Sequence, residues 1–510
     1  MSITKRTVLV VGITLLGILA ISALYQVDAV ELTEEDFVPL ATQGFLTAVD
    51  GPHPEGSRRN SYMWSMRWWN DQLYVGTVRD VLCWRGGGVP PEYATVCPPP
   101  GTLTPDQAAE IWAYTPGGRD GAHGTWERVF QSPVIPIPSQ PSLIPLDIGY
   151  RNMIECDAGG TELLYVVNFG AGGRVLYTPD GITYSPASSI GLDTNDKGYR
   201  AVACWKGRLW ISPSGIFIVA ADGTPVFRDN DIAFNKVLLV NDDPSNAASP
   251  WERVLDFQND PDLGDPGNVG VFSMAVFHDA LYLGVSNRTT GIEVWKADGA
   301  ECKKPPQPCT LSWQKIIDDG LGRPLDVTGV PKNAAVMDFS EFNGHLYFGA
   351  TELRNALITR AEMIRIDPND RVDLIVGETR DATAMAAYPN FNCERVGSSC
   401  VPLSGFGAGF GPTGQAQYIW QIEGHKGSLY AGTLETDDSD GFLLWRSEDG
   451  ITWSLVSDDG FGNPFNQGVR KLESSPWGLF LGTANPNTLE EGANGGTGGA
   501  EVWLGIGSQE

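Results

Sequence analysis

The sequence is poor in basic residues and in histidine. Its 510 residues include 35 lysines and arginines, 5 histidines and 62 aspartates and glutamates, so the formal net charge is -27. A surface that binds nucleic-acid phosphates needs clustered lysine and arginine, and this charge balance therefore argues against nucleic acid as a partner. The acidity is consistent with solubility, cation binding or a salty habitat.

Motifs of fixed spacing that mark common catalytic and metal sites are also absent. The chain contains no HExxH, P-loop or nucleophile-elbow motif, and no CxxC pair or cluster of cysteine and histidine. The sequence therefore carries no catalytic signature. A Ser-His-Asp site stays open, because its members can lie far apart in sequence.

Long hydrophobic runs are limited to the N-terminus. Lys5 and Arg6 precede an apolar run from Thr7 to Leu24, followed by a small-x-small cleavage pattern at residues 27–29. This arrangement predicts an export signal over residues 1–29, so we expect a secreted, periplasmic or extracellular protein. The run approaches the roughly 18 residues that cross a bilayer. An uncleaved anchor is therefore the alternative, and only in that case is a membrane a partner.

Glycine, proline and aromatic residues are by contrast abundant, with 61 Gly, 35 Pro and 10% aromatics. This composition suits many short strands joined by turns. The clearest example runs from Tyr418 to Gly462, where apolar runs at 418–422, 428–433, 441–446 and 452–456 are each ended by Gly, Asp or Asn. These runs predict a four-stranded antiparallel meander. Such a unit cannot bury both of its faces alone, so copies of it must stack.

Seven segments repeat the first two strands of this unit, with a turn before a run of the type LYxGT. They begin at Ser61, Tyr150, Tyr199, Val271, Ala334, Tyr418 and Val469. The last repeat ends at its third strand, whereas residues 36–45 resemble the strand and turn of residues 453–462. We therefore predict an all-β, seven-bladed β-propeller, a single domain over residues 30–510, whose N-terminal strand completes the last blade and removes an exposed edge. Six blades, with the third repeat misread, is the alternative.

Eight cysteines in an exported chain predict disulfide bonds. Cys156 and Cys204 fall at nearly equivalent places in consecutive repeats, which brings them close enough to bond. The other predicted pairs are close in sequence and lie in insertions: Cys83 with Cys97, Cys302 with Cys309, and Cys393 with Cys400.

Two turns carry a resemblance to a known family. The segment SEDGITW, residues 447–453, resembles the Asp-box of BNR-repeat propellers with one residue fewer between Asp449 and Gly450, and TPDGITY at 178–184 is a weaker copy. The resemblance implies that the aspartate caps a hairpin turn. It also implies a propeller similar to those of sialidases, some xyloglucan-active glycosidases, sortilin-type receptors and photosystem assembly factors, without choosing among their functions.

The equivalent position of several first strands predicts a ligand-binding site at the central funnel. This column contains Arg151, Arg200 and Arg470, with Trp64, Phe272 and Trp420 in other repeats, and the exits of second strands add Arg79 and Asn287. Arginines around a funnel can clamp a carboxylate or sulfate, and aromatic rings can stack on sugars. The alternative is that the arginines pair with acidic loop residues and lock the blades together.

We therefore expect a binding or scaffold protein whose partner is a glycan, a small anionic ligand or a protein. The rival hypothesis is a glycoside hydrolase that uses carboxylates among Glu352, Glu435 and Asp80. Calcium is the one cofactor that the sequence suggests, in a loop containing Asp193, Asn195 and Asp196, although ordinary turn chemistry explains the same residues.

Overall fold

The computed structural model describes residues 31–507 except for 85–102, 137–142, 171–172, 190–197, 214–215, 220–224, 229–236, 257–264, 266, 301, 306, 308, 353–358, 412–415, 436–440 and 488–495. The predicted all-β architecture is confirmed, since this part of the chain contains one four-residue helix, α2 (Val81–Trp84), and otherwise strands and short 3-10 turns. No helix within these ranges is long and apolar enough to cross a membrane. The predicted export signal lies outside the described residues.

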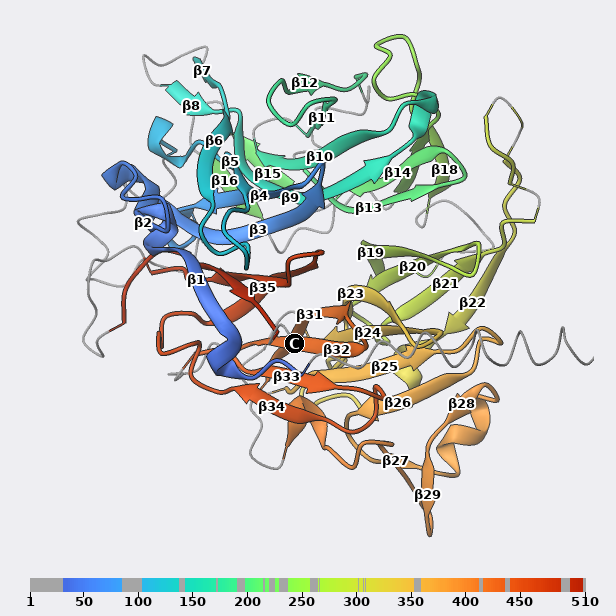
Figure 1. The fold of residues 1–510 in the computed structure, drawn as a ribbon. Helices are drawn as coiled ribbons and strands as arrows, with labels where there is room; N and C mark the ends of the chain where they lie inside the picture. Colours follow the sequence, from blue (N-terminus) through green and yellow to red (C-terminus); the bar gives the residue numbers. More distant parts are fainter. Residues whose placement is uncertain are drawn as a thin grey trace, which may run out of the picture.

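The strands form consecutive four-stranded antiparallel units that surround a common centre, which is the arrangement of a β-propeller (Figure 1). The first strands lie innermost: β3 (Asn60–Trp69), β9 (Asp147–Cys156), β13 (Tyr199–Trp205), β19 (Asn268–Phe277), β23 (Ala335–Phe342), β31 (Tyr418–His425) and β35 (Gly468–Ser474). The second strands are β4 (Gln72–Arg79), β10 (Leu163–Gly170), β14 (Arg208–Pro213), β20 (Ala280–Asn287), β24 (His345–Thr351), β32 (Ser428–Leu434) and β36 (Leu479–Ala484).

The outer positions hold shorter strands. The third strands are β5 (Glu110–Thr115), β11 (Val175–Thr178), β17 (Val237–Asn241), β21 (Glu293–Ala297), β25 (Glu362–Ile366), β33 (Leu444–Ser447) and β37 (Val502–Gly505). The fourth strands are β6 (Thr125–Gln131), β12 (Ser185–Pro186), β18 (Glu252–Asp256), β22 (Trp313–Ile317), β26 (Val372–Val376), β34 (Ser454–Ser457) and β1 (Phe37–Thr42). In the second unit the fourth strand is only the two-residue β12, because the preceding turn occupies residues 178–183.

Some insertions have strands of their own. The described ones are β2 (Thr47–Ala48), β7 (Val134–Pro136), β8 (Leu143–Pro145), β15 (Ile216–Val219), β16 (Pro225–Arg228), β27 (Arg380–Asp381), β28 (Phe391–Asn392), β29 (Glu394–Val396) and β30 (Ser399–Val401). Strands β27, β30 and β29 form a small separate sheet within the insertion at 378–413.

The first and last units are in contact. Strand β1 pairs antiparallel with β37, with Phe37 opposite Gly505 and Val38 opposite Leu504. Each first strand also packs against the first strand of the next unit, and β35 packs against β3. A β-bridge between Tyr62 and Ala484 joins β3 to β36. The N-terminal strand therefore supplies the fourth strand of the last unit.

The glycine of the LYxGT motif is where one unit meets the next. A Cβ added to Gly349 would lie 2.1 Å from the backbone oxygen of Ile419, and one added to Gly432 would lie 2.3 Å from Cβ of Val469. In both cases the contacted residue belongs to the first strand of the following unit. The absence of a side chain therefore lets neighbouring units approach closely.

Three of the predicted disulfide bonds are confirmed. They join Cys156 to Cys204, Cys302 to Cys309, and Cys393 to Cys400. The first links β9 to β13 in neighbouring units, with 5.3 Å between the two Cα atoms. Cys83 is also disulfide-bonded, but its predicted partner Cys97 lies outside the described residues.

The two Asp-box-like turns share one hydrogen-bonding pattern. Oδ1 of Asp449 accepts from the amides of Ile451 at 2.7 Å and Thr452 at 2.6 Å, and Oδ1 of Asp180 accepts from the corresponding amides at 2.9 and 2.7 Å. These backbone hydrogen bonds lower the pKa of Asp180 to about 2. Each aspartate thus caps its hairpin turn, the role that its spacing implied.

We expect Gly349→Ala to destabilise the protein by roughly 1–3 kcal/mol, because the new Cβ would meet a backbone carbonyl that has no room to move. Urea unfolding followed by tryptophan fluorescence measures the change. Gly407→Ala is the matched control, since a Cβ there meets nothing within 4 Å and φ is -66°. Equal unfolding midpoints for the two variants would contradict the packing role of Gly349.

Candidate functional site

Every described first strand has a register shift at the equivalent place. In six of these strands the shift consists of one extra residue that has no partner on the second strand. The extra residue is Trp64 in β3, Arg151 in β9, Arg200 in β13, Phe272 in β19, Trp420 in β31 and Arg470 in β35. In β23 the irregularity spans Met337 and Asp338. A β-bulge redirects the side chain of the extra residue, so these shifts turn equivalent side chains toward the centre.

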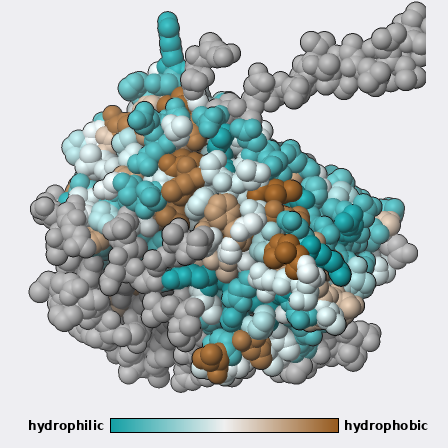
Figure 2. Space-filling view, turned by 90° about the horizontal axis from the view of Figure 1, so that it is seen from below, coloured by the Kyte–Doolittle hydropathy of each residue, from teal (hydrophilic) through white to brown (hydrophobic). Residues whose placement is uncertain are grey.

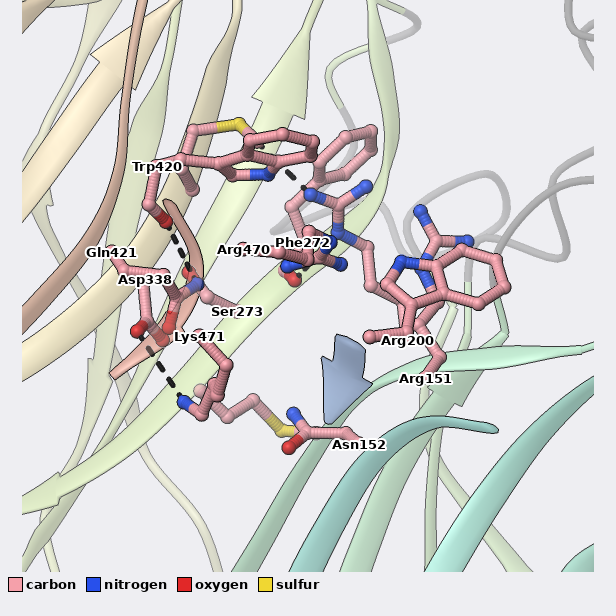
Figure 3. A pocket seen from close by; sticks show the side chains of 13 residues that line it. Arg151, Asn152, Arg200, Phe272, Ser273, Asp338, Trp420, Gln421, Arg470 and Lys471 are labelled. Atoms are coloured by element: carbon pink, nitrogen blue, oxygen red, sulfur yellow. Dashed lines mark hydrogen bonds and ion pairs between the residues drawn. The ribbon is translucent and has the colours of Figure 1, made fainter. Parts of the chain in front are cut away.

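The redirected side chains line one cavity of about 50 Å³. It is lined by Trp64, Arg151, Asn152, Arg200, Phe272, Ser273, Met274, Met337, Asp338, Trp420, Gln421, Arg470 and Lys471 (Figure 3). All of these residues belong to first strands, so each unit contributes to the site. The cavity gathers all six residues of the predicted column: Trp64, Arg151, Arg200, Phe272, Trp420 and Arg470.

Aromatic rings hold the three arginines. Cζ of Arg470 lies 4.7 Å from the ring centre of Trp420, and Cζ of Arg200 lies 4.1 Å from that of Phe272. Arg151 is 5.1 Å from the ring centre of Trp64. Such cation–π contacts keep a guanidinium in place without neutralising its charge.

Arg470 has neither a hydrogen bond nor an ion pair among the described residues, although the carboxylate of Asp338 in the same cavity attracts it. Its residue is 7% exposed, its Nε is buried without a hydrogen-bond partner, and its guanidinium forms no ion pair with any residue that the structure describes. Burial, together with repulsion from Arg200, lowers the pKa of Arg470 to about 9. A buried charge without an ion pair is unfavourable, so this guanidinium is ready to accept an anion.

The other side of the cavity presents acceptors. Figure 3 shows Asp338 and Gln421 on one side and Arg151 and Arg200 on the other. The carboxylate of Asp338 lies 3.7 Å from Nζ of Lys471, and burial raises its pKa. Nε2 of Gln421 donates to its neighbour's backbone oxygen at 2.8 Å, while Oε1 is buried without a hydrogen-bond partner.

Further along the same strands the charges become predominantly acidic. Nε of Arg67 bonds Glu155 at 2.9 Å, and Nη1 lies 3.7 Å from Glu473. Glu423 lies beside this group, and burial together with repulsion from Glu473 raises its pKa to about 8. The centre of the molecule is thus basic at the cavity and acidic beyond it.

The remaining predicted site residues lie away from the cavity lining. Arg79 pairs with Glu110 at 3.2 Å, and Asn287 donates to Asp265 at 2.9 Å. Each contact lies within a single unit, Arg79 bonding to the start of β5 and Asn287 to the segment before β19.

The candidate catalytic carboxylates are also buried outside the cavity lining. Glu352 is 1% exposed, Glu435 is 3% exposed, and Asp80 is fully buried beside Arg59 at 3.0 Å. Burial raises the pKa of Asp80 to about 6.

The predicted calcium ligands Asp193, Asn195 and Asp196 lie outside the described residues. Within the described ranges the one group with metal-ligand spacing is Cys156, Asp157 and Cys204. Its two cysteines form a disulfide bond, so they are not available as thiolate ligands.

A recurrent buried glutamate was missed from the sequence. Glu110, Glu293 and Glu501 lie at the starts of third strands, and each accepts from the indole of the tryptophan two residues later, at 2.9, 2.8 and 2.9 Å. The E-x-W pattern in EIW, EVW and EVW was the available signal. Asp338 and Gln421 were missed because each directly follows the predicted column.

Comparisons with known proteins give only distant similarities. No protein-family model matches the chain, and no curated protein matches its sequence. Among solved structures, the Pan2 WD40 domain of Neurospora crassa is 10% identical with a TM-score of 0.41, covering 93% of this chain and 97% of that one. A puromycin hydrolase is 11% identical with a TM-score of 0.43, covering 89% and 53%. A neuraminidase-like protein from A/bat/Guatemala/164/2009 is 12% identical with a TM-score of 0.35, covering 72% and 91%.

We expect stability to fall as the pH rises from about 5 to 8, because folded Glu423 keeps its proton up to about pH 8 while its ordinary pKa is 4.5. In this window the folded state binds more protons than the unfolded state, so raising the pH favours unfolding. In the Glu423→Gln variant the free energy of unfolding should fall by on the order of 1 kcal/mol less over this pH range, a figure that allows for partial solvent screening of the carboxylate. Urea midpoints at each pH measure it.

Glu252→Gln, at an exposed position of β18, is the control for this experiment. It should reproduce the wild-type pH dependence. A wild-type slope in the Glu423→Gln variant would show that Glu423 titrates normally.

Proposed function

We propose that the protein is an exported β-propeller that binds a small anionic ligand in the central cavity. The carrying observation is Arg470, a buried guanidinium without a hydrogen bond or ion pair among the described residues, placed in a cavity with Arg151 and Arg200. A carboxylate or sulfate would add a direct counter-charge and accept charge-assisted hydrogen bonds from the guanidinium.

The charge balance of the cavity supports an anion. Its lining includes three arginines and Lys471 but one carboxylate, Asp338, in a protein whose net charge is -27. The acidic exterior repels anions at long range, so binding of an anion would depend on the local positive charge of the cavity lining.

The size of the cavity favours a small ligand over a long glycan. One water needs about 10–15 Å³ of such space, so about 50 Å³ holds a few waters or one compact anionic group. The most exposed large apolar side chains, Val327, Ile182 and Val396, lie on separate segments. Figure 2 shows hydrophobic residues in separate patches on a largely hydrophilic face, so that face offers a protein partner no broad apolar surface.

Binding is better supported than glycoside hydrolysis. Hydrolysis by the usual route needs two carboxylates flanking one bond. The cavity lining provides only Asp338, and the candidates Glu352, Glu435 and Asp80 are not part of it.

We infer that seven units form a closed ring. The inference is supported by the contact of β35 with β3, by the β1–β37 pairing, and by Gly482, where an added Cβ would lie 2.7 Å from Cβ of Met63. The disulfide bonds support export, because such bonds persist in oxidising compartments.

We expect Arg470→Met to weaken binding of acetate or sulfate by roughly 10- to 100-fold, which corresponds to the about 1.5–3 kcal/mol of a hydrogen bond to a charged group. Isothermal titration at constant ionic strength measures it, with tryptophan fluorescence as a second signal because Trp64 and Trp420 line the cavity.

Arg253→Met serves as the control for charge removal, because Arg253 is exposed on β18. It should leave anion binding unchanged. Equal affinities for wild type and Arg470→Met, or no anion binding by the wild type, would refute the proposed function.

A further inference from the structure

Three polar groups in the cavity define what a complete ligand must supply. Arg470 needs an acceptor, whereas Gln421 and Asp338 can take further donors. Gln421 is 5% exposed, and its Oε1 has no hydrogen-bond partner within the described ranges. A buried acceptor without a donor carries a free-energy penalty that a ligand donor would relieve.

The orientation of the Gln421 amide follows from its neighbour. Its other terminal atom lies 2.8 Å from the backbone oxygen of Trp420. A carbonyl oxygen only accepts, so the atom facing it is the nitrogen, and the oxygen is the atom left without a partner.

The carboxylate of Asp338 also has few side-chain partners. Its one ion pair is with Nζ of Lys471 at 3.7 Å, longer than a hydrogen bond. Strands β23 and β31 pack against each other, which places Asp338 on the same side of the cavity as Gln421 (Figure 3). Two acceptors, one of them charged, therefore lie across the cavity from Arg151 and Arg200.

We propose that the ligand is a small zwitterion. Its anionic group binds Arg470 together with Arg151 and Arg200, and an ammonium group on the same molecule donates to Gln421 Oε1 and Asp338. This inference rests on the proposed anion-binding function and narrows its ligand class. An ammonium has three donors and no acceptor, which matches an amide oxygen beside a carboxylate.

The cavity also limits the separation of the two charges. A volume of about 50 Å³ corresponds to roughly three to five waters, so only a short chain can join the two charged groups. The ligand class is therefore a short amino acid with a carboxylate or sulfonate, in which the charges are separated by one to three carbon atoms. A neutral hydroxyl in place of the ammonium would satisfy Gln421 but would add no positive charge beside Asp338, whose ion pair with Lys471 is longer than a hydrogen bond.

Matched ligand pairs test the proposal by isothermal titration. The pairs are acetate with glycine, propionate with β-alanine, and butyrate with γ-aminobutyrate, and 3-hydroxypropionate tests a neutral donor. We expect at least one amino acid to bind 10-fold or more tightly than its matched carboxylate. We expect the hydroxy acid to bind within about threefold of propionate.

Asp338→Asn should remove this preference. It should weaken binding of the preferred amino acid at least 10-fold while changing the affinity for its matched carboxylate less than twofold. Glu341→Gln, at an exposed position of the same strand, is the control and should change neither. If Asp338→Asn does not fold, Gln421→Met of similar length replaces it, with a loss of several-fold expected for the amino acid alone.

Several results would overturn the zwitterion. They are equal affinities within every pair, a hydroxy acid that binds as tightly as β-alanine, and an Asp338→Asn variant that weakens both members of a pair equally. If carboxylates still bind and Arg470→Met still abolishes that binding, the anion-binding function stands without the ammonium site. If no ligand binds, both proposals fail.

Discussion

The close approach of neighbouring units through glycine is the contact on which the rest of the structure depends. At Gly349 the nearest atom of the next unit is a backbone oxygen, and at Gly432 it is a side-chain carbon. With any larger residue the first strands would move apart and the centre would widen. The cavity is small because these strands are close, and its smallness gives the buried charges their strength, since water is scarce around them.

Bulges determine what this narrow centre contains. A regular strand would direct alternate side chains away from the centre, whereas an extra residue in each first strand directs Arg151, Arg200 and Arg470 into it. Each of these side chains comes from a different unit. The cavity therefore exists only when the units are assembled.

The strand order and the column of funnel residues could be predicted because both follow from the spacing of residues within each repeat. The LYxGT run sets the register of each hairpin, and the column lies a fixed distance before it. Asp338 and Gln421 escaped prediction because a bulge places two consecutive residues on one face, which alternation forbids. The burial of Glu352 and Glu435 was also not predictable, since loop carboxylates from different units carry no sequence signal for their surroundings.

The pairing of β1 with β37 has a consequence for biosynthesis. Residues 37–42 are synthesised long before their partners, residues 502–505, so β1 stays without its sheet while the intervening units are made. Closing so long a loop is slow but adds little equilibrium cost, because the entropy grows only with the logarithm of length. Until β1 pairs with β37, the free edge of β37 can pair with other chains. The pairing of β1 with β37 is therefore a late step in the folding of this chain.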